Sequence, residues 1–88
     1  MKEAVLTITN QDGFHMRPAS ELVKVTSRFR SRITVERDGL EVDGKSILGV
    51  LMLAAGRSPE IHVRAEGVDE DEAIEAVKKL LEEKFGEE

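Results

Sequence analysis

Short runs of aliphatic and β-branched residues recur along the chain and predict four strands. Residues 4–8 and 32–35 form two such runs, and residues 40–42 form a third. Asp38-Gly39 lies between the last two runs and supplies the positive φ angles that a tight hairpin turn needs. Within residues 61–65 apolar and polar side chains alternate, which is the period of a half-buried strand.

Three other segments carry apolar residues at helical spacing. Behind Pro18, whose missing N–H suits the first turn of a helix, such residues recur for about three turns. Ser46 precedes the apolar run 47–53, which predicts a short helix capped by the Ser46 side chain. Asp69 and Glu72 have the spacing of a helix-capping pair, so we expect a long amphipathic helix to follow. Its inner face should consist of Ala73, Ile74, Val77, Leu80, Leu81 and Phe85, with Gly86 behind it.

The order of the expected elements is strand, helix, strand, strand, short helix, strand, helix. This order predicts an α+β fold, an open-faced β-sandwich in which a four-stranded antiparallel sheet carries the helices on one face. The chain has 88 residues, enough for one domain, 1–88. A domain of this size encloses little interior, so we expect its chemistry to take place on the surface.

Composition narrows the class of function. The net charge of −5 and the absence of Trp and Tyr argue against nucleic-acid binding, which favours a basic surface and stacking rings. The chain has no Cys, so disulfides and thiolate metal sites are excluded, and a reducing compartment such as the cytoplasm is expected. The sequence shows neither a signal peptide nor an apolar run of membrane-spanning length, so we expect no membrane association.

One short segment combines residues suited to phosphoryl chemistry. The sequence Gly-Phe-His-Met-Arg-Pro-Ala at 13–19 places His15 and Arg17 where a loop turns into a helix. The free backbone N–H groups and the dipole of a helix start favour an anion, and a guanidinium offers a donor fork for phosphate oxygens. A neutral imidazole carries a lone pair that can attack phosphorus, without any metal or cofactor. The simpler interpretation of these two residues alone is a loop histidine beside a solvated arginine.

The same segment resembles the active-site signature of the HPr family, the phosphocarriers of the bacterial phosphoenolpyruvate-dependent sugar phosphotransferase system. Lys-Ser-Ile-Leu-Gly-Val at 45–50 is similar to the family's second signature, which surrounds its regulatory serine. The resemblance implies that His15 accepts a phosphoryl group from phosphorylated Enzyme I and gives it to the Enzyme IIA domain of a sugar permease. It implies that Arg17 steadies that group. Such a protein is a carrier and not an enzyme, and we expect it to be a monomer without cofactors.

The resemblance also implies a docking surface for both partners. Two basic residues of the first predicted helix, Lys24 and Arg28, would guide an acidic Enzyme I, although exposed basic residues on a helix more often only face the solvent. The apolar side chains expected around His15, which would form the docking surface, are Phe14, Met16, Ile47, Leu48 and Leu51. Three of them, Phe14, Met16 and Leu48, stand where the family more often has Leu, Ala and Met. A simpler interpretation of Ile47 and Leu51 is that they belong to the core.

Ser46 carries the remaining expectation. By resemblance it is the serine that an ATP-dependent HPr kinase/phosphorylase modifies, and the product signals to a regulator of carbon catabolite repression. The alternative function is therefore mainly regulatory, either through phosphorylated Ser46 or as a nitrogen-branch phosphocarrier. His62 lies on the polar face of its predicted strand and the acidic run 66–75 suits a solvated helix start, so we assign a function to neither and expect no metal site.

Overall fold

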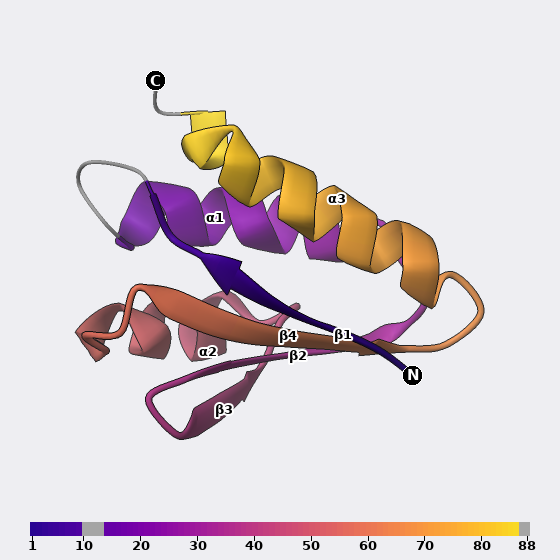
Figure 1. The fold of residues 1–88 in the computed structure, drawn as a ribbon, viewed down its shortest axis with the longest axis horizontal. Coiled ribbons are helices and arrows are strands. Elements are labelled where there is room, and N and C mark those ends of the chain that lie inside the picture. Colours follow the sequence, from indigo (N-terminus) through magenta and orange to yellow (C-terminus); the bar gives the residue numbers. More distant parts are fainter. Residues whose placement is uncertain (10–13, 87–88) are drawn as a thin grey trace.

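The computed structural model describes residues 1–9 and 14–86 of the chain. Its elements follow the expected order (Figure 1). The strands are β1 (Lys2–Thr7), β2 (Arg32–Arg37), β3 (Leu40–Asp43) and β4 (Glu60–Glu66). The α-helices are α1 (Met16–Thr26), α2 (Ile47–Met52) and α3 (Glu70–Glu82), and two short 3₁₀ turns, η1 (Leu53–Ala55) and η2 (Lys84–Gly86), follow α2 and α3.

The four strands form one antiparallel sheet in the order β1-β4-β2-β3. The second and fourth strands of the chain are therefore central, and Val63 of β4 faces Ala4 on one side and Val35 on the other. Along β4 the side chains of Ile61, Val63 and Ala65 are buried, while those between them are only partly covered. The alternation predicted for this segment is confirmed because successive side chains of a strand point to opposite faces.

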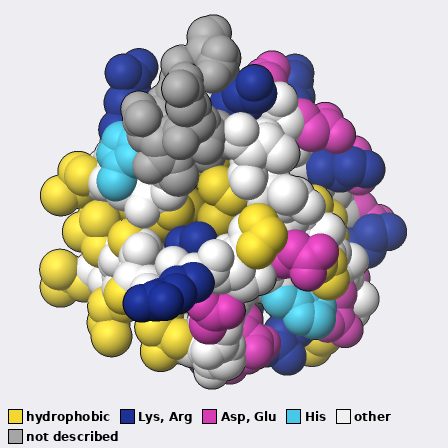
Figure 2. Space-filling view, turned by 60° about the vertical axis from the view of Figure 1, so that its left-hand side comes forward, with side chains coloured by type: hydrophobic (Ala, Val, Ile, Leu, Met, Phe, Trp, Pro, Cys, Tyr) yellow, Lys and Arg dark blue, Asp and Glu magenta, His cyan; other side chains and the backbone are white. Residues whose placement is uncertain are grey.

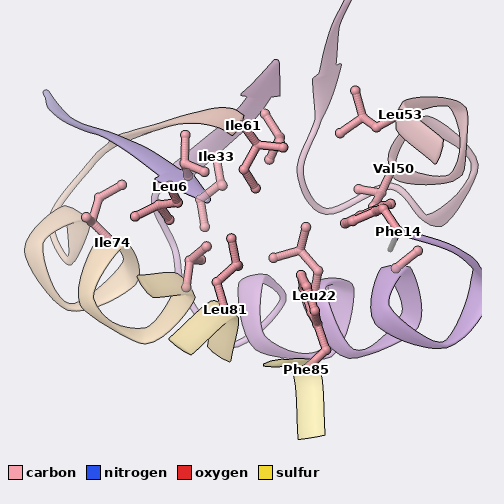
Figure 3. Close-up of a cluster of buried hydrophobic side chains, with 14 of the residues drawn as sticks. Leu6, Phe14, Leu22, Ile33, Val50, Leu53, Ile61, Ile74, Leu81 and Phe85 are labelled. Atoms are coloured by element: carbon pink, nitrogen blue, oxygen red, sulfur yellow. The ribbon is translucent and has the colours of Figure 1, made fainter. Parts of the chain in front are cut away.

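Helices cover one face of the sheet and leave the other open, which confirms the predicted open-faced sandwich. Side chains from all three helices join the inner face of the sheet in one buried cluster (Figure 3). The open face carries charged groups. Arg64 forms ion pairs there with Glu36 and Glu41, and Nε2 of His62 lies 3.4 Å from a carboxylate oxygen of Glu3.

The start of α3 differs from the prediction. The carboxylate of Asp69 makes no capping bond to its own helix and instead accepts hydrogen bonds from the α1–β2 connection. The amide of Gly67 donates to a carboxylate oxygen of Glu70 at 3.1 Å, a bond with the same three-residue spacing but two residues earlier than the predicted pair. Asp69 is the N-cap residue of α3, as predicted, but the capping bond expected of its side chain is wrong, because that carboxylate binds a distant segment.

The end of α3 also differs. The helix stops at Glu82, and Phe85 lies beyond it in η2, where both Lys84 and Phe85 have positive φ angles of 56° and 57°. Phe85 is nevertheless buried, as its place on the expected inner face required. In the described part of the chain, no helix has the length and hydropathy needed to cross a bilayer.

Candidate functional site

His15 lies at the junction between loop and helix, as the sequence predicts. It is the N-cap residue of α1, with an extended backbone (φ −141°, ψ −162°), and its carbonyl accepts the first helical hydrogen bond, from the amide of Ala19 at 3.0 Å. The imidazole is half-buried, and its Nε2 atom is shielded from solvent. Gly13, the first residue of the motif, lies outside the described residues.

The beginning of α1 is well suited to an anion. The amides of Met16 and Arg17 come before the first carbonyl-to-amide bond of the helix, and Pro18 has no N–H at all. The first turn contains no carboxylate, whereas the first turn of α3 contains three. The positive end of the α1 dipole is therefore not neutralised by its own helix, and the exposed Arg17 adds a full positive charge.

Phe14 does not belong to the exposed surface that was expected around His15. Its side chain is only 7% exposed, and its ring packs edge to face against that of Phe85, with ring centroids 5.8 Å apart and planes at 84°. A phenyl ring gains more from burial in the core than from exposure at a loop. The exposure expected of Phe14 is wrong, because its side chain is buried. No local pattern in the sequence signals its contact with Phe85.

Ser46 occupies the N-cap of α2, which confirms the predicted cap. Its hydroxyl oxygen accepts a hydrogen bond from the amide of Gly49 at 3.2 Å, and its backbone is extended (φ −102°, ψ 118°). The side chain is half-buried. The first turn of α2, like that of α1, contains no carboxylate.

The apolar residues of α2 divide between core and surface. Ile47 and Leu51 are partly buried and pack against the core, so the simpler view of them holds in part. Leu48 is 75% exposed and Met16 is 59% exposed, as expected for a docking surface. Met52 is also 58% exposed, and its spacing of four residues from Leu48 could have identified it. The helices α1 and α2 pack together, and Figure 2 shows hydrophobic side chains gathered beside one of the two histidines.

The other expected positions lie outside this group. Lys24 and Arg28 are exposed near the C-terminal end of α1, and Lys24 pairs with Glu21 at 3.1 Å. A hollow of about 650 Å³ lies along β2 and β3, but neither His15 nor Ser46 lines it. Among residues 1–9 and 14–86, no three His, Asp or Glu side chains are grouped as metal ligands.

Comparison with known proteins shows the family to which the chain is related. Residues 2–83 match the family model PTS-HPr, which describes the phosphorylation site of the HPr component. A phosphocarrier protein HPr of Xylella fastidiosa (strain Temecula1) is 44% identical over 87 residues, which are 99% of this chain and 98% of that protein.

Solved structures agree in fold. The crystal structure of HPr-C-His from Thermoanaerobacter tengcongensis superposes with a TM-score of 0.91 at 45% identity, covering 100% of this chain and 99% of that one. A structure of an HPr dimer from the same organism has a TM-score of 0.76 at 45% identity and covers 99% of this chain and 100% of that one. The chain belongs to the HPr family of phosphocarrier proteins of the phosphotransferase system.

Proposed function

We propose that His15 is the phosphoryl acceptor, which receives the group from phosphorylated Enzyme I and passes it to the Enzyme IIA domain of a sugar permease. The observation that carries this proposal is the place of His15 at the N-cap of α1. Three features lie beside its side chain there. They are backbone amides without a hydrogen-bond acceptor in the helix, the positive end of a helix dipole that no carboxylate of the first turn compensates, and the exposed guanidinium of Arg17. A tetrahedral anion on the ring is stabilised by all three.

Burial of one ring nitrogen supports the other as the reacting atom of the imidazole. Nε2 is shielded from solvent, so Nδ1 is the nitrogen that attacks the phosphorus atom. As the new N–P bond forms, the bond from phosphorus to the donor breaks, and the electron pair of that bond stays with the donor. The second transfer repeats the step with His15 as the leaving group. Positioning and charge stabilisation suffice for such a transfer, so the protein acts as a carrier without cofactor and without net turnover of its own.

The exposed apolar side chains provide the docking surface for the two partners in this proposal. Met16, Leu48 and Met52 lie on the packed pair α1 and α2, and Ile47 and Leu51 support them from the core side. Apolar side chains in such a position favour a protein interface. Lys24 and Arg28, exposed near the C-terminal end of α1, supply positive charge that guides an acidic Enzyme I. A carrier that meets two partners in turn through one surface acts as a monomer in the cytoplasm.

The proposal is tested with phosphoenolpyruvate and a purified Enzyme I. The incubated protein is analysed by mass spectrometry for an acid-labile phosphate, beside the variants His15→Ala and His62→Ala. We expect the label on His15 in the natural sequence and in His62→Ala, and no label in His15→Ala. Addition of an Enzyme IIA domain should then remove it. A label on His62, or none with a competent Enzyme I, contradicts the carrier role.

Ser46 supports a second, regulatory function of the same chain. A phosphate at the start of α2 meets a helix terminus that contains no carboxylate, which is locally favourable. Its negative charge also stands directly before Ile47 and Leu48, where it opposes docking of an acidic partner. In this proposal an HPr kinase/phosphorylase modifies Ser46, and the product serves a regulator of catabolite repression.

Two variants distinguish the regulatory role proposed for Ser46 from its role as a helix cap. Ser46→Ala removes the cap and should cost about 1 kcal/mol of folding free energy without slowing transfer from Enzyme I. Ser46→Asp retains a capping oxygen and adds charge, so it should fold like the natural sequence but accept phosphate more slowly. Equal transfer rates for the two variants would remove the electrostatic basis of the regulation.

A further inference from the structure

We infer that Phe85 is a positioning residue for His15, acting through the ring of Phe14. The inference rests on the proposed phosphoryl-acceptor role and goes beyond it, because it assigns a part in that role to the segment that follows α3. The two rings are in edge-to-face contact, with centroids 5.8 Å apart, and Phe14 is joined directly to His15 along the backbone.

Phe14 is the anchor of the segment that leads into the site. In the described part of the chain between Leu6 and Pro18, only Phe14 is buried. The backbone of His15 must be extended for its carbonyl to accept the first α1 bond, from Ala19. The position of the Phe14 ring therefore fixes the direction in which the chain enters the N-cap, and with it the direction of the imidazole.

The backbone around Phe85 indicates that this ring is held in place at a cost. The backbones of Lys84 and Phe85 both lie in the left-handed region, at φ 56° and 57°, which residues other than glycine rarely adopt. Two such residues in succession persist only where packing compensates for them. Phe85 is 1% exposed and contacts both the core and the ring of Phe14, so burial of its side chain contributes to this compensation.

Phosphoryl transfer between two proteins depends on the placement of a single ring nitrogen. A displacement of about 1 Å in a reacting group is enough to slow a reaction by roughly 100-fold. When Phe85 is truncated, Phe14 loses the surface against which its ring rests, and the N-cap of α1 gains freedom. The expected result is a loss of transfer rate that exceeds what lowered stability alone produces.

The test compares Phe85→Ala and Phe85→Leu with core variants at the other end of the same cluster. Ile74 of α3 is 3% exposed and lies at the end of the cluster away from Phe14 (Figure 3). Ile74→Ala and Ile74→Val therefore lower the melting temperature over a range that can be compared with the Phe85 variants, and they leave the contacts of the Phe14 ring unchanged. Three quantities are measured well below every melting temperature: the NMR resonances of the His15 imidazole through a pH titration, the hydrogen-exchange rate of the Ala19 amide, and the initial rate of transfer from Enzyme I.

We expect Phe85→Ala to shift the His15 resonances, to speed exchange at Ala19 and to lower the transfer rate by about threefold or more, with Phe85→Leu intermediate. The Ile74 variants should leave all three unchanged. The inference is overturned if Phe85 and Ile74 variants of equal stability behave alike, or if the rate falls while the His15 resonances stay in place. If the natural sequence accepts no phosphate at all, the proposed function fails, and the two spectroscopic measurements still decide the positioning role.

Discussion

Nη1 of Arg37 donates a 2.9 Å hydrogen bond to the carbonyl of Leu53, at the point where α2 passes into η1. Nε of the same guanidinium donates to the carbonyl of Ser58 at 2.8 Å. One side chain from the end of β2 thus binds both ends of the connection that follows the exposed residues of α2. The adjacent Asp38, in the hairpin turn, accepts hydrogen bonds from the backbone amides of Arg57 and Ser58 at 2.6 and 3.2 Å. It therefore binds the same connection as Arg37.

The first prediction concerns this clamp. Arg37→Gln should lower the free energy of unfolding by about 1–3 kcal/mol, because two partly buried carbonyls lose a charged donor. Urea denaturation measures the loss, and hydrogen exchange should show faster opening of α2 and η1. Arg57→Gln is the control, since that side chain is exposed and only its backbone amide is bonded to Asp38. Equal stability of the two variants would show that the clamp contributes nothing.

The second prediction concerns acid stability. The hydroxyl of Ser31 and the amides of Arg30 and Ser31 donate to Asp69 and lower the pKa of this carboxyl from 3.8 to about 2. A lowered pKa in the folded state means that the charged form stabilises the fold. This stabilisation is complete above the unfolded pKa and is lost as the pH falls toward 2.

The melting temperature of the natural sequence should therefore fall more steeply between about pH 5 and pH 2 than that of Asp69→Asn, which is less stable at neutral pH. Asp71→Asn is the matched control, because the side chain of Asp71 is 74% exposed and only reaches Lys2 at 3.7 Å. Its melting curve should follow the natural one. Parallel pH profiles for Asp69→Asn and the natural sequence would refute the link between these hydrogen bonds and acid stability.

The third prediction concerns Arg17. Loss of one charge-assisted hydrogen bond to the phosphoryl group, worth about 1.5–3 kcal/mol, should slow transfer by roughly 10- to 100-fold in Arg17→Ala. The transfer rate of Arg17→Lys should lie between those of the natural sequence and Arg17→Ala, because an ammonium group retains the charge but not the planar pair of donors. Quenched-flow labelling with Enzyme I gives the rates. Arg57→Ala, which removes an exposed arginine from a different connection, should transfer normally, and a normal rate for Arg17→Ala would argue against its stabilising role.

The fourth prediction concerns the docking surface. Leu48→Glu should raise KM for Enzyme I by about fivefold or more, equivalent to roughly 1 kcal/mol of docking free energy, because a charge replaces an apolar contact. Its stability should change by no more than about 0.5 kcal/mol, since the side chain is 75% exposed. Val68, which is 84% exposed between β4 and α3, provides the control Val68→Glu. Equal KM values for the two variants would exclude Leu48 from the interface.

Local chemistry explains which features could be predicted from the sequence. The alternation along 61–65 is sufficient to assign the faces of β4, because the side-chain period of a strand is two. Ser46 could be recognised as a cap because its acceptor and its donor, the amide of Gly49, lie three residues apart. His15 could be placed at the start of α1 from Pro18 and the helical spacing behind it.

The missed features depend on contacts between distant segments. Asp69 has the sequence of a helix cap, but its three donors belong to the connection between α1 and β2. Phe14 precedes His15 in the chain and looks like part of an exposed surface, yet its ring meets Phe85 beyond α3. Neither contact leaves a periodic pattern in the sequence, because each joins one residue of one element to one residue of another.

The sheet order has a consequence for the way the chain is made. Among the four described strands β1 is translated first, but its partner in the sheet is β4, which is translated last. The partners of the β2–β3 hairpin follow one another in the chain, whereas β1 has no strand to pair with until β4, which lies between β1 and β2 in the sheet, has been made. The strand that leads toward His15 is thus translated early and paired late, and during that interval the nascent chain exposes an unpaired strand.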